Sequence, residues 1–251
     1  MKNPFIKLLL VSCILLSKVW ATPMSSSPVI LLDNWPPYIV GTVGKEPIGG
    51  DLLKFNQYIF QKMGYEDPPL VAIWTDVLSK IFLGTADMTI GFKNDDRAQF
   101  ADFSVPFATI SRYLYFRQAD AEKFKNYDGY KSLVGKKIGL IKGFDYGELL
   151  YNSLALGLDI AYFDSYRDMQ KALSRKRIDT YIYIDDRSQL PAEIAKSDYV
   201  VQSRLIHYFI SKKSRHSADM EKLNRVIKDT LNDPELQDLL PERLRMASPA
   251  R

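Results

Sequence analysis

Apolar residues along this chain follow two alternating patterns. Short apolar runs such as residues 29–33 are typical of buried strands, whereas residues 51–63 place apolar side chains three or four positions apart and predict a helix. Gly64 follows as a natural helix stop. Further strands are predicted over residues 70–73 and 87–91.

A short helix fits between the last two of these strands. Thr75 can cap it, and Val77, Ile81 and Phe82 are expected to face inward. These elements together form a βαβαβ series.

A second series follows a loop over residues 118–135. Its predicted elements are strand 137–141, helix 145–156, strand 160–163, helix 165–176 and strand 179–184. Alternation of this kind implies parallel sheets with helices on both faces, and two series imply two lobes.

Two aromatic, β-branched runs, residues 110–117 and 205–211, flank the second series, and an amphipathic helix over 217–231 follows. The apolar face of this last helix must pack against a hydrophobic core. We therefore expect an α/β fold of two lobes, each a mostly parallel sheet flanked by helices, with two extended crossovers as a hinge. The expected boundaries are 28–113 plus 208–251 for lobe one, and 114–207 for lobe two.

The first residues resemble a secretory signal. Lys2 and Lys7 precede an apolar run over residues 8–16, and small residues follow, so cleavage is predicted after Ala21. A buried N-terminal strand or helix and lipidation at Cys13 are the alternatives. The signal predicts a periplasmic protein.

Composition narrows the function classes. The formal charge is +4, but three of the 34 basic residues leave with the signal, so 31 then face 30 acidic ones and no basic excess favours nucleic acid. No apolar stretch reaches the roughly 18 residues of a membrane-spanning helix. With two histidines, one cysteine inside the signal and no phosphate-loop motif, no metal or cofactor is predicted.

Candidate chemistry lies in four loops beyond the carboxyl ends of predicted strands, where open α/β sheets bind ligands. These loops are residues 34–38, 92–97, 143–146 and 185–186. They supply aromatic walls, a cation and several acids, which can hold a small zwitterion. An arginine grips a carboxylate through paired hydrogen bonds of roughly 1.5–3 kcal/mol each, and an aspartate accepts from an ammonium group.

The candidate ligand-binding residues are Arg97, Asp185, Trp35, Tyr38, Phe92, Asp145 and Trp74. Each has a structural alternative. Arg97 can be a solvated surface residue, and residues 35–38 can form an ordinary rigid turn. Trp74 can pack in a core, Asp145 can cap a helix, and Asp185 can belong to a turn.

Several segments, in order, resemble the bacterial extracellular solute-binding proteins of family 3, the polar amino acid type of periplasmic binding protein. They are residues 47–53 (PIGGDLL), 84–87 (GTAD), 96–107 (DRAQFADFSVPF), 133–140 (LVGKKIGL) and 177–179 (RID). The resemblance covers residues 28–240. No single motif is decisive, but their order is specific.

The resemblance implies a non-enzymatic protein that closes on an amino-acid-like solute and delivers it to the permease of a membrane ABC transporter. By position, Arg97 is similar to the residue that grips the ligand carboxylate, and Asp185 to the acid that holds the amino group. Two features depart from the family. Residues 92–94 replace small hydroxyl residues, and Asp145 stands where a threonine or serine usually helps to bind the carboxylate.

Two other functions remain open at this stage. The first is a periplasmic dehydratase resembling the cyclohexadienyl type, with Asp145, Glu148, Asp185 or Asp186 as proton donor. The second is a sensor module that signals to a separate membrane receptor through the same closure.

Overall fold

The computed structural model describes residues 27–185 and 190–246, so the predicted signal, its cleavage site and Cys13 lie outside the described residues. Its α-helices are α1 (Leu53–Met63), α2 (Trp74–Leu83), α3 (Asp95–Ala98), α4 (Glu148–Leu156), α5 (Tyr166–Ser174) and α6 (Met220–Asn232). Its strands are β1 (Leu31–Asp33), β2 (Val40–Gly41), β3 (Pro47–Gly49), β4 (Leu70–Ala72), β5 (Met88–Phe92), β6 (Ala101–Phe103), β7 (Ala108–Arg117), β8 (Lys137–Ile141), β9 (Asp159–Phe163), β10 (Thr180–Ile184), β11 (Ile194–Lys196) and β12 (Gln202–Ser211).

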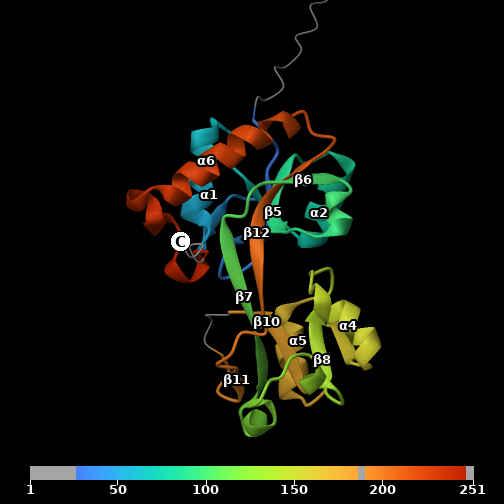
Figure 1. The fold of residues 1–251 in the computed structure, drawn as a ribbon. Coiled ribbons are helices and arrows are strands. Elements are labelled where there is room, and N and C mark those ends of the chain that lie inside the picture. Colours follow the sequence, from blue (N-terminus) through green and yellow to red (C-terminus); the bar gives the residue numbers. More distant parts are fainter. Residues whose placement is uncertain (1–26, 186–189, 247–251) are drawn as a thin grey trace, which may run out of the picture.

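Two lobes lie one above the other, and β7 and β12 run between them (Figure 1). The upper lobe contains α1, α2 and α6, and the lower lobe contains α4 and α5. The predicted two-lobed α/β architecture is thus confirmed. The predicted lobe boundaries fall inside β7 and β12, and they stay our proposal.

The sheet is mixed because the crossing strands run against their neighbours. It has the order β5-β12-β7-β10-β8-β9, with β6 on β12 and β11 on β7. In the lower lobe β8 pairs in parallel with β9 and β10, as the alternating pattern predicts, but β7 pairs antiparallel with β10 and β12. Through β12 and β7, one hydrogen-bonded sheet therefore continues from the upper lobe into the lower lobe.

Helix α1 shows how the apolar spacing becomes packing. Phe55, Ile59 and Met63 are buried along one face, and Gly64 ends the helix with φ of 80°. At this positive φ glycine meets no steric penalty from a side chain. Helix α6 covers the same core with Leu223 and Ile227, as its pattern predicts.

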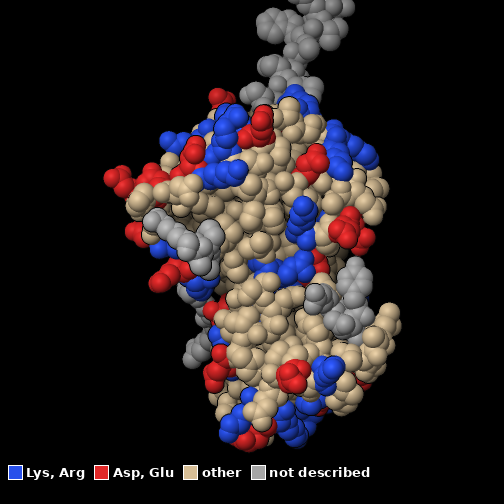
Figure 2. Space-filling view, in the orientation of Figure 1, with Lys and Arg blue, Asp and Glu red and all other residues tan. Residues whose placement is uncertain are grey.

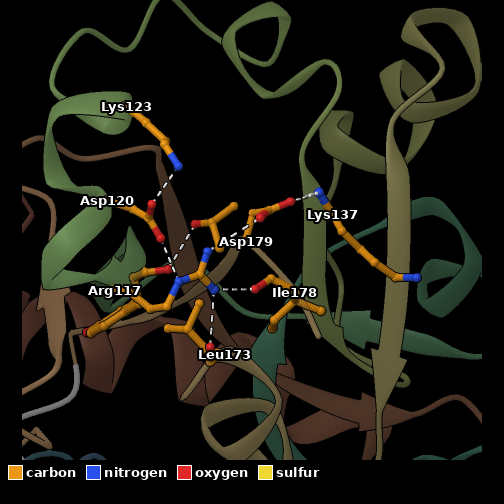
Figure 3. Close-up of polar contacts among 9 residues, drawn as sticks. Arg117, Asp120, Lys123, Lys137, Leu173, Ile178 and Asp179 are labelled. Atoms are coloured by element: carbon orange, nitrogen blue, oxygen red, sulfur yellow. Dashed lines mark hydrogen bonds and ion pairs between the residues drawn. The ribbon is translucent and has the colours of Figure 1, made fainter. Parts of the chain in front are cut away.

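The base of the lower lobe is held by Arg117, at the end of β7 (Figure 3). Its guanidinium donates to the carbonyl oxygens of Leu173 at 3.1 Å and Ile178 at 2.7 Å, and pairs with Asp120 at 2.5 Å. Asp179 accepts from Arg117 and from the backbone amide of Lys137. These contacts join β7, α5 and β8.

Three local predictions were wrong. Thr75 does not cap α2, which begins at Trp74 and has Ile73 as its N-cap. Phe82 is exposed because it lies about a quarter turn beyond the buried Val77 and Ile81, and it packs on Phe100 instead. The fourth helix begins at Glu148 rather than at residue 145.

The predicted loop over 118–135 contains two 3-10 helices, Gln118–Phe124 and Lys131–Leu133. Over residues 27–185 and 190–246, no helix combines the length and apolar character needed to cross a membrane. The same ranges contain no group of three histidine, cysteine or acidic side chains that could hold a metal ion.

Candidate functional site

A cavity lies between the lobes, beside the crossing strands. Its lobe-one wall consists of Asp33, Trp35, Ile39, Trp74, Ile90, Gly91, Phe92 and Arg97, and its lobe-two wall of Phe144 and Asp145. Its volume is about 30 Å³, far below the roughly 300 Å³ of a small ligand pocket. In this conformation the protein's own side chains fill most of the space, so a solute of amino-acid size needs the lobes to part.

A wider groove of about 1060 Å³ opens from the same place and shares Arg97, Phe144 and Asp145 with the cavity. Arg204 lies on its wall. Figure 2 shows basic side chains at the waist of the molecule, between the upper and lower lobes. The cleft therefore has a narrow interior and an open mouth that is lined by both basic and acidic side chains.

Arg97 is positioned by the short helix α3. The Asn94 side chain caps this helix by accepting the Arg97 amide at 2.9 Å, and Arg97 Nη1 donates to the Phe92 carbonyl at 2.8 Å. The guanidinium carbon lies 4.8 Å from the centre of the Trp74 ring. Arg97 is 5% exposed, and burial lowers its pKa to about 10. A buried cation on a cavity wall is suited to pairing with an anion.

Aromatic rings form the rest of the wall. Trp35 meets the ring of Phe92 edge-on with centres 5.6 Å apart, and its indole nitrogen is buried without a hydrogen-bond partner among the described residues. Trp74 Nε1 donates across the cleft to the Gly143 carbonyl at 3.1 Å. A Cβ at Gly91 would lie 3.2 Å from the Trp74 ring, so glycine lets that ring approach the sheet.

Asp145 is held by residues of the protein itself. Its carboxylate pairs with Arg204 of β12 at 2.8 Å and accepts from the Asn94 amide at 3.1 Å. It also accepts the Gly147 amide at 2.7 Å, within the turn before α4, whose N-cap is Gly147. Arg204 donates in addition to the Lys93 carbonyl at 3.0 Å. Asp145 and Arg204 therefore connect the two lobes at the mouth of the cleft.

Gly147 makes room for this pairing. Its φ is +54°, a conformation that favours glycine, and an added Cβ would lie 2.3 Å from Arg204 Nη1. The glycine therefore serves both the turn and the close approach of the arginine.

Asp33 is an acid of the cavity that the sequence analysis did not select. It ends β1, and the backbone amides of Trp74 and Asn34 donate to its carboxylate. Burial raises its pKa to about 7 despite these hydrogen bonds. It also takes the amide at the start of α2, which explains why Thr75 is not needed as a cap.

Arg112 was also missed. This residue of β7 is 1% exposed, and its guanidinium carbon lies 4.8 Å from the ring centres of both Phe92 and Tyr146. Nη1 donates to Gln202 at 2.8 Å, whereas Nη2 is buried without a partner among the described residues. Burial lowers its pKa.

Asp185 lies outside this cavity. Its carboxylate pairs with Lys196 at 2.5 Å, and the Lys196 ammonium lies 4.3 Å from the ring centre of Tyr113. Tyr38 is fully buried and packs edge-on against Trp35 with ring centres 5.1 Å apart. The structure thus gathers five of the seven candidates, Arg97, Trp35, Trp74, Phe92 and Asp145, around the cavity. The opposition of Arg97 and Asp185 across a ligand stays a prediction.

Comparison with known proteins bears on the fold. No protein-family model and no curated protein matches the sequence. Many solved structures resemble this one, among them the following three.

The amino acid ABC transporter substrate-binding protein AbpA of Streptococcus pneumoniae, bound to L-arginine, has 18% identity and a TM-score of 0.64 over 84% of this chain and 92% of its own. A histidine kinase sensor domain with similarity to periplasmic binding proteins has 14% identity and a TM-score of 0.68 over 85% and 94%. The ancestral amino acid-binding protein AncCDT-1, a precursor of cyclohexadienyl dehydratase, has 15% identity and a TM-score of 0.67 over 84% and 93%.

These likenesses identify the class of fold: this chain has the two-lobed fold of periplasmic binding proteins. The fold expected from the family 3 resemblance is confirmed. Identities of this level show the fold alone, and solute-binding proteins and a sensor domain share it. The function must therefore be argued from the cleft.

Proposed function

We propose that this protein binds a small polar or zwitterionic, amino-acid-like solute in the cleft by lobe closure, and delivers it to a membrane ABC transporter. The observation that carries the proposal is Arg97, a buried cation on a wall that both lobes complete. One of its nitrogens holds the Phe92 carbonyl, while the described residues offer its other nitrogens no acceptor. A carboxylate between the lobes would satisfy them.

The hinge supports closure as the binding step. Only β7 and β12 carry the sheet between the lobes in the described ranges, and Trp74 and Asn94 of lobe one contact Gly143 and Asp145 of lobe two directly. A solute shifts such an equilibrium only through its differential affinity for the closed state. We propose a periplasmic location and cleavage after Ala21 as parts of the same function.

Calorimetry against amino acids, amines and small peptides tests the proposal. We expect at least one such solute to bind with a Kd below roughly 1 mM, about 4 kcal/mol. Mass spectrometry of any small molecule that co-purifies provides an unbiased second test. The proposal fails if the full panel and the co-purified fraction both give no bound solute.

A sensor role is the second candidate, and the sensor domain with the same fold favours it. The binding event would be the same, but the partner would be a membrane receptor. Co-purification from membranes separates the two: a permease supports transport, and a receptor kinase supports sensing.

A dehydratase is the third candidate, because AncCDT-1 has the same fold and the cavity contains an acid with a raised pKa. That acid is Asp33, which was not among the four acids selected from the sequence. Glu148 and Asp186 do not bear on this point, since the structure describes neither side chain. Turnover of prephenate or arogenate that is lost in Asp33→Asn would support the enzyme, and absence of turnover would remove this version.

A further inference from the structure

Three guanidinium groups gather around Phe92 at the base of the cleft. Arg97 donates to its carbonyl at 2.8 Å. The guanidinium carbons of Arg112 and Arg204 lie 4.8 and 5.5 Å from the centre of its ring. These arginines come from α3, β7 and β12, so the fold and not a basic run in the sequence brings them together.

Carboxylates do not balance this cluster. Asp145 pairs with Arg204 and acts electrostatically on Arg97 and Arg112. Asp33 also lies on the cavity wall. Among the buried and half-buried groups, three cations therefore face one carboxylate when Asp33 is protonated and two when it is ionised, while Asp96 acts on Arg97 from the exposed mouth. The interior is positive in both states. The exposed side chains at the mouth, Lys93, Asp95 and Asp96, are screened by solvent.

The unsatisfied polar atoms near the cavity are donors. Trp35 Nε1 and Arg112 Nη2 are both buried and have no hydrogen-bond partner in the described part of the chain. A buried donor without an acceptor destabilises a protein. Of the two donors, Trp35 Nε1 belongs to a residue of the cavity wall, and an oxygen of an acidic solute could supply its missing acceptor.

Two of the three acids considered for an ammonium group are already engaged. Lys196 neutralises Asp185 at 2.5 Å, and Arg204 neutralises Asp145 at 2.8 Å. Asp33 alone among the described acids of the cavity wall has no cation paired with it. An amino group on the solute thus has Asp33 as its one partner on the described cavity wall, whereas carboxylates can meet Arg97 and Arg204.

We infer that the cleft selects a small organic acid with two carboxylates, and that an amino group on this solute is not required for binding. The inference rests on the proposed function and specifies its substrate class. Arg97 and Arg204 both line the groove at the cleft mouth. Arg97 is placed to take one carboxylate, and Arg204 would take the second by exchanging its partner Asp145 for the solute. Arg112, behind Phe92, adds positive potential without direct contact.

A charge series of solutes with five-carbon backbones tests the inference. L-Arginine, L-glutamine, L-glutamate and glutarate run from a net charge of plus one to minus two, and dicarboxylates of three to six carbons vary the spacing. Calorimetry on the mature protein should show glutarate or another dicarboxylate without an amino group binding at least about tenfold more tightly than glutamine and arginine. Tight binding of glutamate alone would contradict the statement that the amino group is not required. Equal or tighter binding of glutamine or arginine would overturn the inference. A series in which no acidic solute shows any binding would also overturn it.

Failure of the inference differs from failure of the proposed function. If no acidic solute binds but another amino acid, amine or peptide of the wider panel does, the proposed solute class is wrong and the proposed binding function stands. If no solute binds at all, the function itself fails.

Two variants change the preference in opposite directions, which a loss of folding cannot mimic. Arg204→Gln should lower the ratio of glutarate to glutamine affinity, and Asp145→Asn should raise it, each by about fivefold or more. Arg225→Gln on the exposed face of α6 is the control and should leave the ratio unchanged. Ratios that stay the same in both cleft variants would contradict the inference.

Discussion

Arg204 and Asp145 join the crossing strand β12 to the second lobe, with Nη2 2.8 Å from Oδ2 and side chains that are 20% and 8% exposed. The same arginine donates to the Lys93 carbonyl of the first lobe. One side chain thus holds both walls of the cleft mouth, and the closed arrangement depends on it.

Removing this contact should favour the open form. For Arg204→Gln we expect a larger radius of gyration in solution scattering and a loss of about 1–3 kcal/mol in the free energy of unfolding, because a mostly buried carboxylate loses its partner. Lys142 and Asp164 supply the matched control, a pair with the same 2.8 Å separation but side chains 58% and 82% exposed. Lys142→Gln should change stability by less than about 1 kcal/mol. Equal effects of the two variants would show that the cleft pair has no special role.

Arg97 should dominate solute affinity. Replacement by alanine removes the buried cation and should weaken binding by about 2–5 kcal/mol, measured by calorimetry. Arg97→Lys keeps the charge but not the paired donors, so it should retain only part of the affinity. A loss below about 0.5 kcal/mol in Arg97→Ala would assign Arg97 to structure alone.

Asp33 should make stability depend on pH. Its pKa is about 7 in the folded protein against 3.8 as the ordinary value, so the folded state holds the proton that the unfolded state has lost between these limits. The free energy of unfolding therefore falls as pH rises from about 4 to about 7, and then levels off. Asp33→Asn can still accept hydrogen bonds and should remove this fall. At pH 8 the free energy of unfolding of the variant should therefore exceed that of the original protein by about 2–4 kcal/mol.

Chemical denaturation at pH 4, 6 and 8 measures this difference. Asp102→Asn, at an exposed position of β6, is the control and should give a constant difference across the series. An advantage of Asp33→Asn that is the same at all three pH values would contradict the assignment.

The Arg117 network should stabilise the second lobe without touching the cleft. Arg117→Met removes the guanidinium that donates to the carbonyls of Leu173 and Ile178 and to the carboxylate of Asp120, so we expect a loss of about 3 kcal/mol in stability. Solute affinity should stay within about twofold. Lys123→Met removes the 69% exposed end of the same network and should cost less than about 0.5 kcal/mol.

Much of the scaffold could be predicted because its apolar periods are regular. The strand expected over 137–141 has those bounds, and α1 ends where Gly64 predicts. The start of α2 was missed because its first amide is bound by Asp33, which is distant in sequence and invisible to local capping rules. Contacts of this kind arise only when the chain has folded.

The sequence predicted several residues of the candidate site but not the ion pairs that those residues form. Loop position and the family 3 resemblance selected Arg97, but neither could show that Lys196 engages Asp185 or that Arg204 engages Asp145. A signal for Arg112 was present: it shares the buried face of β7 with Ile110, Leu114 and Phe116. A charged residue at an apolar position of a strict alternation marks a special environment.

The two tryptophans that follow the predicted cleavage site, Trp35 and Trp74, both line the cleft. The indole of Trp74 donates to the Gly143 carbonyl of the opposite lobe, whereas that of Trp35 stays buried against Phe92. The mature chain therefore carries its own optical reporter. Opening exposes the Trp74 indole to water and should shift its fluorescence emission to longer wavelength, so that solute titrations can be followed without any attached dye.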